Sequence, residues 1–280
     1  MAHETTQHYS QEVELFARFL DPYMKYSSGL FLDRSESLDT GILRMLDQHI
    51  NLGSLPESPR VLEIGNGWGS LLKRLKERAP GLSYVGVNPS AVQQDYVARE
   101  IDASVDLRVA PFEEVMDALE GGFDAIYMIG SLCHIKDKAR VLKRVGELLA
   151  DDGRLVLEDT FFLSEALYQK HYARPETKFV QSEVFGYAHI FSLARHFDLV
   201  REAGLRVMTT LDTSDDYART IEIWEERIAA LDPARFPLAP QFIQYMDVFQ
   251  RGWGYTISNH LMALERLPRR APSLVPPVRG

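Results

Sequence analysis

Hydrophobic residues recur along the chain at two spacings, and these spacings predict an alternation of helices and strands. Segments 13–20 and 37–50 carry apolar residues three and four positions apart, which is the spacing of one helical face. From residue 60 onward, similar helical segments alternate with short apolar runs at 60–64, 84–87, 107–109, 125–129 and 154–157. Because strands that alternate with helices form a parallel sheet covered by helices, the pattern predicts an α/β fold.

The alternation stops after Glu158. Residues 161–191 are rich in Phe and Tyr but show no clear period. Beyond them the pattern predicts a helix bounded by Ser192 and Gly204, a strand at 205–211, helices from about Tyr217 and over about 240–251, and a last strand at 255–265.

These elements predict a Rossmann-like, mostly parallel seven-stranded sheet with helices on both faces. We expect an N-terminal helical cap (1–58), one domain (59–267) with a lid insertion (161–200), and a disordered tail (268–280). Local signals set some boundaries: Asn88-Pro89 is expected to start a helix as its N-cap and first position, and Asp151-Asp152-Gly153 to form a turn.

A glycine-rich loop follows the first expected strand. It reads Glu63-Ile64-Gly65-Asn66-Gly67-Trp68-Gly69, and a helical pattern begins at Ser70. Glycines tolerate positive φ and let a ligand approach bare backbone, while a helix start offers free N–H groups to an anionic group. The spacing is neither the G-x-G-x-x-G of dinucleotide sites nor the G-K-[ST] of phosphate-binding loops. The loop predicts a ligand site of another class; the alternative is a glycine turn in an unrelated α/β protein.

The composition and charge of this 280-residue chain argue against several classes of binding partner. Its net charge of −9 argues against a nucleic-acid binder and against docking on anionic lipid. No segment approaches the roughly 20 apolar residues of a membrane helix, and the N-terminus lacks a signal-peptide pattern. The single cysteine fits a reducing compartment. We therefore expect a cytoplasmic protein that acts on a small molecule, with no nucleic acid and no stable membrane insertion.

Ligands of open α/β sheets bind beyond the carboxyl ends of the strands, and this selects further candidates. Asn88 follows the second strand, where dinucleotide-binding folds place an acidic residue on the ribose hydroxyls of the ligand. Asn88 either makes such a bond or caps the next helix. Pro111 and Phe112 follow the third strand, and Phe112 either packs on an adenine ring or belongs to the core. Gly130 follows the fourth strand.

His134 and Cys133 lie just beyond Gly130. A histidine here suits a general base, because its ordinary pKa lies near neutral pH, but a structural role is the alternative. Cys133 reads as a small buried hydrophobe rather than a nucleophile. No Cys or His pair has the spacing of metal ligands, so we expect no metal.

Several segments share one known pattern. They are Tyr26-Ser27-Ser28-Gly29, the glycine loop with Trp68, Gly86-Val87-Asn88-Pro89-Ser90 with Gln93, Ser131-Leu132-Cys133-His134-Ile135, and Asp216-Tyr217-Ala218-Arg219-Thr220 with Trp224. Together they resemble the cyclopropane-fatty-acid-synthase branch of the class I methyltransferases. The resemblance implies S-adenosylmethionine (SAM) as methyl donor and S-adenosylhomocysteine (SAH) as product.

Carried over residue by residue, the resemblance implies that Tyr26, Ser27, Gly65, Gly67, Trp68 and Gln93 contact SAM and that His134, with Tyr26, lies at the reaction centre. With the loop and strand-end candidates added, the expected cofactor-binding set is Tyr26, Ser27, Glu63, Gly65, Asn66, Gly67, Trp68, Gly69, Asn88, Gln93, Pro111, Phe112 and Gly130.

Two positions depart from that family. Cyclopropane synthases carry a cysteine and a glutamate that help hold a bicarbonate base, where this chain has Ser28 and Cys133. The departure argues against cyclopropane formation.

Aromatic side chains are expected to enclose the acceptor, because ring faces suit apolar groups and stabilise cations, although each ring taken singly fits the core as well. The expected pocket residues are Tyr23, Phe31, Tyr168, Tyr172, Phe179, Tyr187 and Phe191. The leading hypothesis is C-methylation of an isoprenoid or other unsaturated chain in secondary metabolism, with or without carbocation-driven cyclisation. The alternatives are N- or O-methylation of an aromatic small molecule with His134 as base, and a SAM-binding fold used as a non-methylating cyclase. A homo-oligomer is a further expectation.

Overall fold

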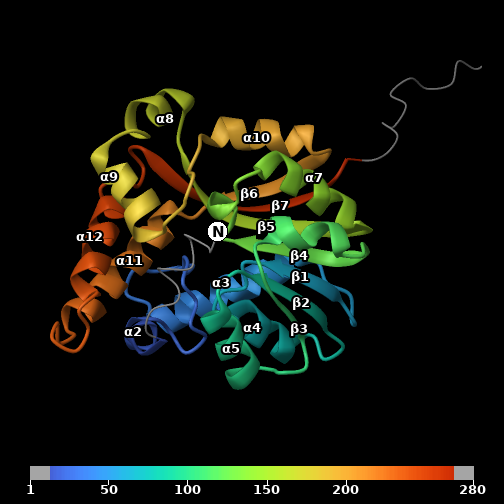
Figure 1. Ribbon diagram of the computed structural model, residues 1–280, viewed down its shortest axis with the longest axis horizontal. Helices are drawn as coiled ribbons and strands as arrows, with labels where there is room; N and C mark the ends of the chain where they lie inside the picture. Colours follow the sequence, from blue (N-terminus) through green and yellow to red (C-terminus); the bar gives the residue numbers. More distant parts are fainter. Residues whose placement is uncertain (1–12, 268–280) are drawn as a thin grey trace, which may run out of the picture.

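A seven-stranded sheet forms the centre of the computed structural model, which describes residues 13–267 (Figure 1). The strand order is β3-β2-β1-β4-β5-β7-β6, in which β7 is antiparallel to both of its neighbours and the other pairings are parallel. The strands are β1 (Arg60–Ile64), β2 (Ser83–Asn88), β3 (Asp106–Val109), β4 (Phe123–Ile129), β5 (Leu149–Phe162), β6 (Leu205–Asp212) and β7 (Ile257–Arg266). The expected mostly parallel sheet of seven strands is confirmed.

Helices cover both faces of the sheet. One face carries α3 (Leu38–Gly53), α4 (Ser70–Arg78) and α5 (Ala91–Glu100), and the other carries α7 (Lys138–Leu148) and α10 (Leu193–Glu202) (Figure 1). Successive strand residues point to opposite faces, so each strand supplies two cores. In β1, for example, Val61 belongs to the cluster under α3 and α4, and Leu62 to the cluster under α7.

The remaining helices lie at one end of the sheet, on the left of Figure 1. They are α2 (Val13–Phe19), α8 (Glu165–His171), α9 (Pro175–Lys178), the π-helix η3 (Phe179–Val184), α11 (Ser214–Ala229) and α12 (Ala239–Gln250). The structure packs α11 against α2 and α12, and α12 against η3. We call α2, η3, α11 and α12 the lid helices. Short turns of helix follow β3 and β4: α6 (Phe112–Val115), η1 (Met116–Ala118) and η2 (Leu132–His134).

One local expectation was wrong. Asn88 does not cap the next helix, because it still belongs to β2; Ser90 is the N-cap, and its hydroxyl accepts a hydrogen bond from the amide of Gln93. The strand β5 continues through residues 151–153, and the expected turn appears there as an irregularity within it. Leu149 pairs with Phe123 and Arg154 with Ala125, and a Cβ added at Gly153 would lie 2.9 Å from the amide nitrogen of Ala150. The expected helix between Ser192 and Gly204 is confirmed, with Ser192 as its N-cap.

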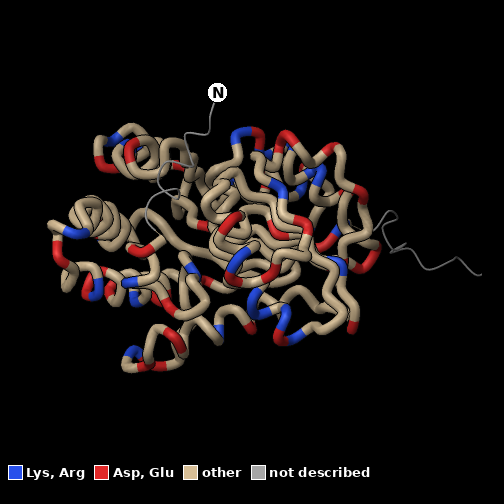
Figure 2. The backbone as a smooth tube through the Cα atoms, turned by 60° about the horizontal axis from the view of Figure 1, so that its bottom comes forward, with Lys and Arg blue, Asp and Glu red and all other residues tan. Residues whose placement is uncertain are grey.

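Charged residues of both signs are interspersed along the outer segments (Figure 2). Many form exposed pairs, such as Arg251 with Asp247, and such pairs contribute at most about 1 kcal/mol each. The described part of the chain contains no helix long and apolar enough to cross a membrane. The tail at 268–280 and the first twelve residues lie outside the described residues, and the division into cap, domain and lid stays a prediction.

Candidate functional site

A cavity of about 620 Å³ lies at the carboxyl ends of β1 to β4. It brings together twelve of the thirteen residues expected to bind the cofactor: Tyr26, Ser27, Glu63, Gly65, Asn66, Gly67, Trp68, Asn88, Gln93, Pro111, Phe112 and Gly130. Gly69 is the exception. It is the N-cap of α4 with φ of 76°, and a Cβ there would lie 2.6 Å from Ile101, so its role in the structure is close packing.

The two central glycines of the loop differ in what surrounds them. Gly65 has φ of +81°, and a Cβ added there would lie 2.6 Å from Cβ of Ser131. Gly67 has φ of +48°, and a Cβ there would meet nothing within 4 Å. Gly65 therefore allows the loop to pack on the residues after β4, whereas Gly67 presents bare backbone to the cavity of about 620 Å³.

Glu63 supplies a buried carboxyl group at the end of β1. Its Oε2 accepts a hydrogen bond of 2.5 Å from the hydroxyl of Tyr84. Burial raises the pKa of Glu63 to about 8, although the Tyr84 bond and the charge of Lys25 act in the opposite direction. A cationic ligand group beside this carboxyl would stabilise its ionised form, so the site is suited to an ammonium group.

Asn88 and Gln93 are both buried in the wall of this cavity and bond to each other, with Nδ2 of Asn88 donating to Oε1 of Gln93 over 2.8 Å. Phe112 lines the cavity and also belongs to the hydrophobic core beneath α7. For Phe112 the two alternatives, ligand contact and core packing, are therefore compatible.

A second, smaller cavity of about 70 Å³ adjoins the first, and the two share Tyr26, Ser27, Gly130 and His134. The lid helices and the residues beside them supply its aromatic walls. The rings are Phe185, Tyr217, Trp224, Tyr245 and Phe249. Its polar lining is Glu158, Asp159, Thr160 and Asn259, at the ends of β5 and β7.

None of the seven aromatic residues expected to enclose the acceptor lines either cavity. The hydroxyl of Tyr23 bonds Glu77, Tyr168 and Tyr172 pack with His189, and Phe191 packs with Phe161. Phe31 packs on Gly41, while Phe179 lies against the core and Tyr187 accepts a bond at its carbonyl. A signal for the residues that do line the smaller cavity was present, because Tyr217 and Trp224 belong to the Asp216–Trp224 stretch of the family pattern.

His134 lines both cavities. A hydrogen bond and burial determine which of its ring nitrogens carries a proton. A carbonyl oxygen only accepts, so Nδ1 donates to the carbonyl of Tyr187 over 2.8 Å, and Nε2 carries the lone pair. Burial lowers the pKa of His134 to about 4. The ring is neutral at neutral pH and is a weak base. Burial also raises the pKa of the Cys133 thiol well above its ordinary value, so this thiol stays protonated.

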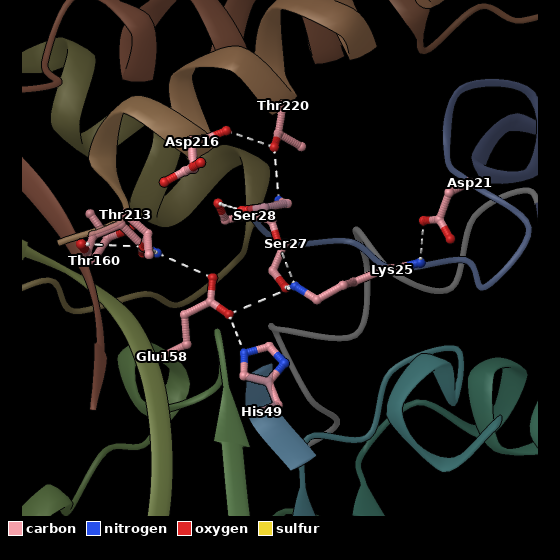
Figure 3. A network of polar contacts seen from close by, with 12 residues as sticks. Asp21, Lys25, Ser27, Ser28, His49, Glu158, Thr160, Thr213, Asp216 and Thr220 are labelled. Carbon is pink, nitrogen blue, oxygen red and sulfur yellow. Dashed lines mark hydrogen bonds and ion pairs between the residues drawn. The ribbon is translucent and has the colours of Figure 1, made fainter. Parts of the chain in front are cut away.

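A buried polar network ties the Tyr26–Ser27 loop to the end of β5 (Figure 3). Nζ of Lys25 bonds Oγ of Ser27 and the carbonyl of Ser28, and lies 3.7 Å from Oε2 of Glu158. The same carboxylate oxygen is 2.8 Å from Nε2 of His49. On the other side of the loop, the hydroxyl of Tyr26 is hydrogen-bonded to that of Tyr245 in α12. Hydrogen bonds from the Lys25 side and from α12 thus fix Tyr26 and Ser27, two of the residues that the cavities share.

The described residues contain no group of three or more His, Cys, Asp or Glu side chains that could hold a metal ion, and the expectation of no metal stays a prediction.

The amino-acid sequence matches the family model "Mycolic acid cyclopropane synthetase" over residues 1–249. The methyltransferase UmaA of Mycobacterium tuberculosis is 26% identical over 242 residues, which cover 81% of this chain and 82% of that protein. The (S)-coclaurine N-methyltransferase of Papaver somniferum is 28% identical over 138 residues, 48% of this chain but only 39% of that enzyme.

Solved structures agree with the fold. The mycolic acid cyclopropane synthase CmaA1 complexed with SAH and CTAB superposes with a TM-score of 0.81 at 20% identity, covering 94% of this chain and 97% of that chain. The geranyl diphosphate C-methyltransferase of Streptomyces coelicolor superposes with a TM-score of 0.72 at 15% identity, covering 94% and 97%. Because the family model spans most of the sequence, the chain belongs to the mycolic acid cyclopropane synthetase family and is a SAM-dependent methyltransferase.

Proposed function

We propose that this enzyme transfers a methyl group to a small, largely apolar acceptor, at an unsaturated carbon of an isoprenoid-like chain whose reacting end enters the smaller cavity. The observation that carries the proposal is the arrangement of the two cavities. The larger one holds the residues expected to bind SAM, and the smaller one, walled by aromatic rings, adjoins it across Tyr26, Ser27, Gly130 and His134.

The larger cavity suits SAM on its own chemistry. Gly67 leaves room for a ligand against the backbone, Glu63 suits its ammonium group, and Asn88 with Gln93 offers amide groups for hydroxyl groups. Bound there, SAM supplies an electrophilic methyl group on a sulfonium sulfur. The protein then has to align the acceptor with that methyl group and exclude water, which is worth up to roughly 7–11 kcal/mol of the barrier.

Glu63 gives the larger cavity a testable pH dependence. Because burial raises its pKa to about 8, Glu63 is mostly protonated at neutral pH, and an arriving ammonium group favours the ionised form. Binding of SAH should therefore release a proton, and its affinity should rise with pH by up to about tenfold per unit until about pH 8. Calorimetry in buffers of different ionisation enthalpy measures both effects. Glu63→Gln should remove the proton release, and an affinity for SAH that is flat over this range would contradict the assignment.

The aromatic lining favours carbon methylation. Methyl addition to an alkene leaves a carbocation, and a ring face stabilises a cation by about 0.5–2 kcal/mol. Trp224, Tyr217 and Tyr245 supply such faces, with Trp224 in contact with Tyr26 at a ring-centre distance of 5.2 Å. Ser28 and Cys133 stand where the cyclopropane synthases carry the cysteine and the glutamate, which favours methylation without ring closure.

N- or O-methylation of an aromatic acceptor is the second candidate, and the similarity to the coclaurine enzyme supports it. His134 is a poor base for that reaction, because burial lowers its pKa to about 4. A non-methylating cyclase is the third candidate. The [4+2]-cyclase SpnF shares the fold with a TM-score of 0.70 at 18% identity, and this likeness bears on the fold alone. Cytoplasmic location and a homo-oligomer remain sequence-based proposals.

A substrate panel separates the candidates. Purified enzyme is incubated with methyl-labelled SAM and, in turn, geranyl diphosphate, an unsaturated phospholipid and coclaurine, and the products are identified by mass spectrometry and NMR. We expect a new carbon–methyl bond on an unsaturated chain. A product methylated only on nitrogen or oxygen would favour the second candidate. SAH binding with no methylation of any compound would contradict the proposal.

A further inference from the structure

Two adjacent acidic residues, Glu158 and Asp159, line the smaller cavity near the end of β5. Successive side chains of a strand point to opposite faces of the sheet, so the two groups have different neighbours. Glu158 faces α3 and the Tyr26–Ser27 loop, whereas Asp159 faces the η2 turn. Their different surroundings assign them different roles.

Glu158 is fully engaged in the polar network of Figure 3. Oε2 contacts His49 and Lys25, and Oε1 accepts a bond of 3.1 Å from Nδ2 of Asn259. Burial alone would raise the pKa of Glu158, but the charge of Lys25 and the bonds from His49 and Asn259 hold it at about 2. Glu158 therefore stays ionised and takes up no proton near neutral pH.

Asp159 has a different set of contacts. Oδ1 accepts a bond of 2.8 Å from the amide of Thr160, and Oδ2 accepts one of 2.9 Å from the amide of Cys133. Among residues 13–267 no Lys, Arg or His lies within ion-pair distance of this carboxylate. Two backbone amides thus fix the carboxylate of a residue that lines the aromatic cavity, and they do not neutralise its charge.

We propose that Asp159 is the catalytic base that takes the proton released by the acceptor. The proposal rests on the proposed function. Each methyl group gained by the acceptor replaces one hydrogen: the methyl–sulfur bond breaks, a methyl–acceptor bond forms, and the displaced hydrogen leaves as a proton to a carboxylate oxygen of Asp159. For an alkene acceptor this proton comes from a carbon next to the cationic centre, and its bonding electrons form the new double bond.

The basicity of Asp159 supports the assignment. Burial raises its pKa to about 6, while the bonds from Thr160 and Cys133 and the charge of Lys138 act against the rise. A base is most effective when its pKa lies near the working pH. The other titratable groups around it are the Cys133 thiol, His134 and, directly across on β7, His260. Burial lowers the pKa of His134 to about 4 and raises that of the thiol, so neither is a better base at neutral pH. Burial also lowers the pKa of His260, and this residue does not line the smaller cavity.

The test uses Asp159→Asn and Asp159→Ala with a compound of the panel that the wild-type enzyme methylates. For Asp159→Asn we expect kcat to fall by about 10²–10⁴-fold while SAH affinity is unchanged. In the wild type at saturating SAM, kcat/KM for the acceptor should rise with pH through a midpoint of about 6, and this rise should vanish in Asp159→Asn. Added formate should restore turnover to Asp159→Ala, which a merely structural role would not allow. Asp152→Asn, the same change at an exposed position of β5, is the matched control with wild-type kcat expected.

Wild-type turnover by Asp159→Asn, or no rescue of Asp159→Ala by formate, would overturn the assignment but leave the proposed function standing. An acceptor-independent measurement covers the case in which no compound of the panel is methylated and the proposed function itself fails. Aromatic rings and a carboxylate together bind quaternary ammonium ions. In the SAH-bound wild type, tetramethylammonium should bind more tightly above about pH 6 than below it, and equally at both in Asp159→Asn. Equal pH dependence in both proteins would show that the cavity does not reach the Asp159 carboxylate and would overturn the proposal.

Discussion

Replacing Lys25 by methionine is expected to lower the free energy of unfolding by about 3–5 kcal/mol, because it leaves the Glu158 carboxylate buried without its cation. Both side chains are 2% exposed, so water cannot replace the lost partner. The change also removes the ammonium group that bonds Ser27 and the Ser28 carbonyl, so turnover should fall together with stability. Chemical denaturation measures the first effect, and methyl transfer measures the second.

Two further variants and the pH dependence sharpen this prediction. Lys25→Met combined with Glu158→Gln should recover part of the lost stability, since the uncompensated charge is gone. Lys143→Met, at an exposed position of α7, should change stability by no more than about 0.5 kcal/mol. The folded-state pKa of Glu158 is lowered to about 2, so its contribution to wild-type stability is present above its ordinary pKa of 4.5 and is lost as the pH falls toward 2. The penalty of Lys25→Met should shrink over the same interval, and a penalty that is small and independent of pH would contradict the ion-pair role.

Gly67→Ala is expected to weaken SAH binding by tenfold or more, about 1.4 kcal/mol, while the protein stays folded. The new Cβ would meet no protein atom within 4 Å, so it would occupy space that the cavity offers to the ligand. Its positive φ adds a stability cost of about 1–2 kcal/mol. Calorimetry with SAH and thermal unfolding separate the two effects.

Gly204→Ala is the matched control for this change. Gly204 has φ of +74°, and its added Cβ also meets nothing within 4 Å, but it lies beyond α10 and outside the cavities. It should show the same loss of stability with wild-type affinity for SAH. Gly65→Ala should instead destabilise the fold, because its Cβ would collide with Ser131. If Gly67→Ala binds SAH as tightly as Gly204→Ala does, the loop is not the cofactor cradle.

The parts of the site that depend on residue type could be predicted from the sequence. Gly65 and Gly67 have positive φ, which most other residues avoid. The glycines of the sequence therefore predict the conformation of the loop. Strand ends were equally predictable, since the apolar runs give the strands and the sheet places their carboxyl ends together. The start of α5 could not be predicted, because Asn and Ser are both good N-cap residues. Which of Asn88 and Ser90 caps the helix depends on where β2 ends.

The acceptor side could not be predicted in the same way. The many aromatic residues of 161–191 do not reveal which way their side chains point. In the structure Tyr168, Tyr172 and Phe191 pack with other rings and with His189. The rings that line the smaller cavity include Tyr217 and Trp224 of α11. Their helical periodicity resembles that of an ordinary core, so only their place in the family pattern marks them. The Lys25–Glu158 pair joins a loop to a strand far away in the sequence, and neither residue carries a local signal of the other.

The lid helices enter the chain at three separate places: before β1, between β5 and α10, and between β6 and β7. The residues expected to bind SAM all lie outside the lid helices, so these helices can be replaced without changing any of those residues. Chimeras that receive residues 161–191 and 213–256 from another family member are therefore the direct route to redirecting the enzyme toward new chemistry.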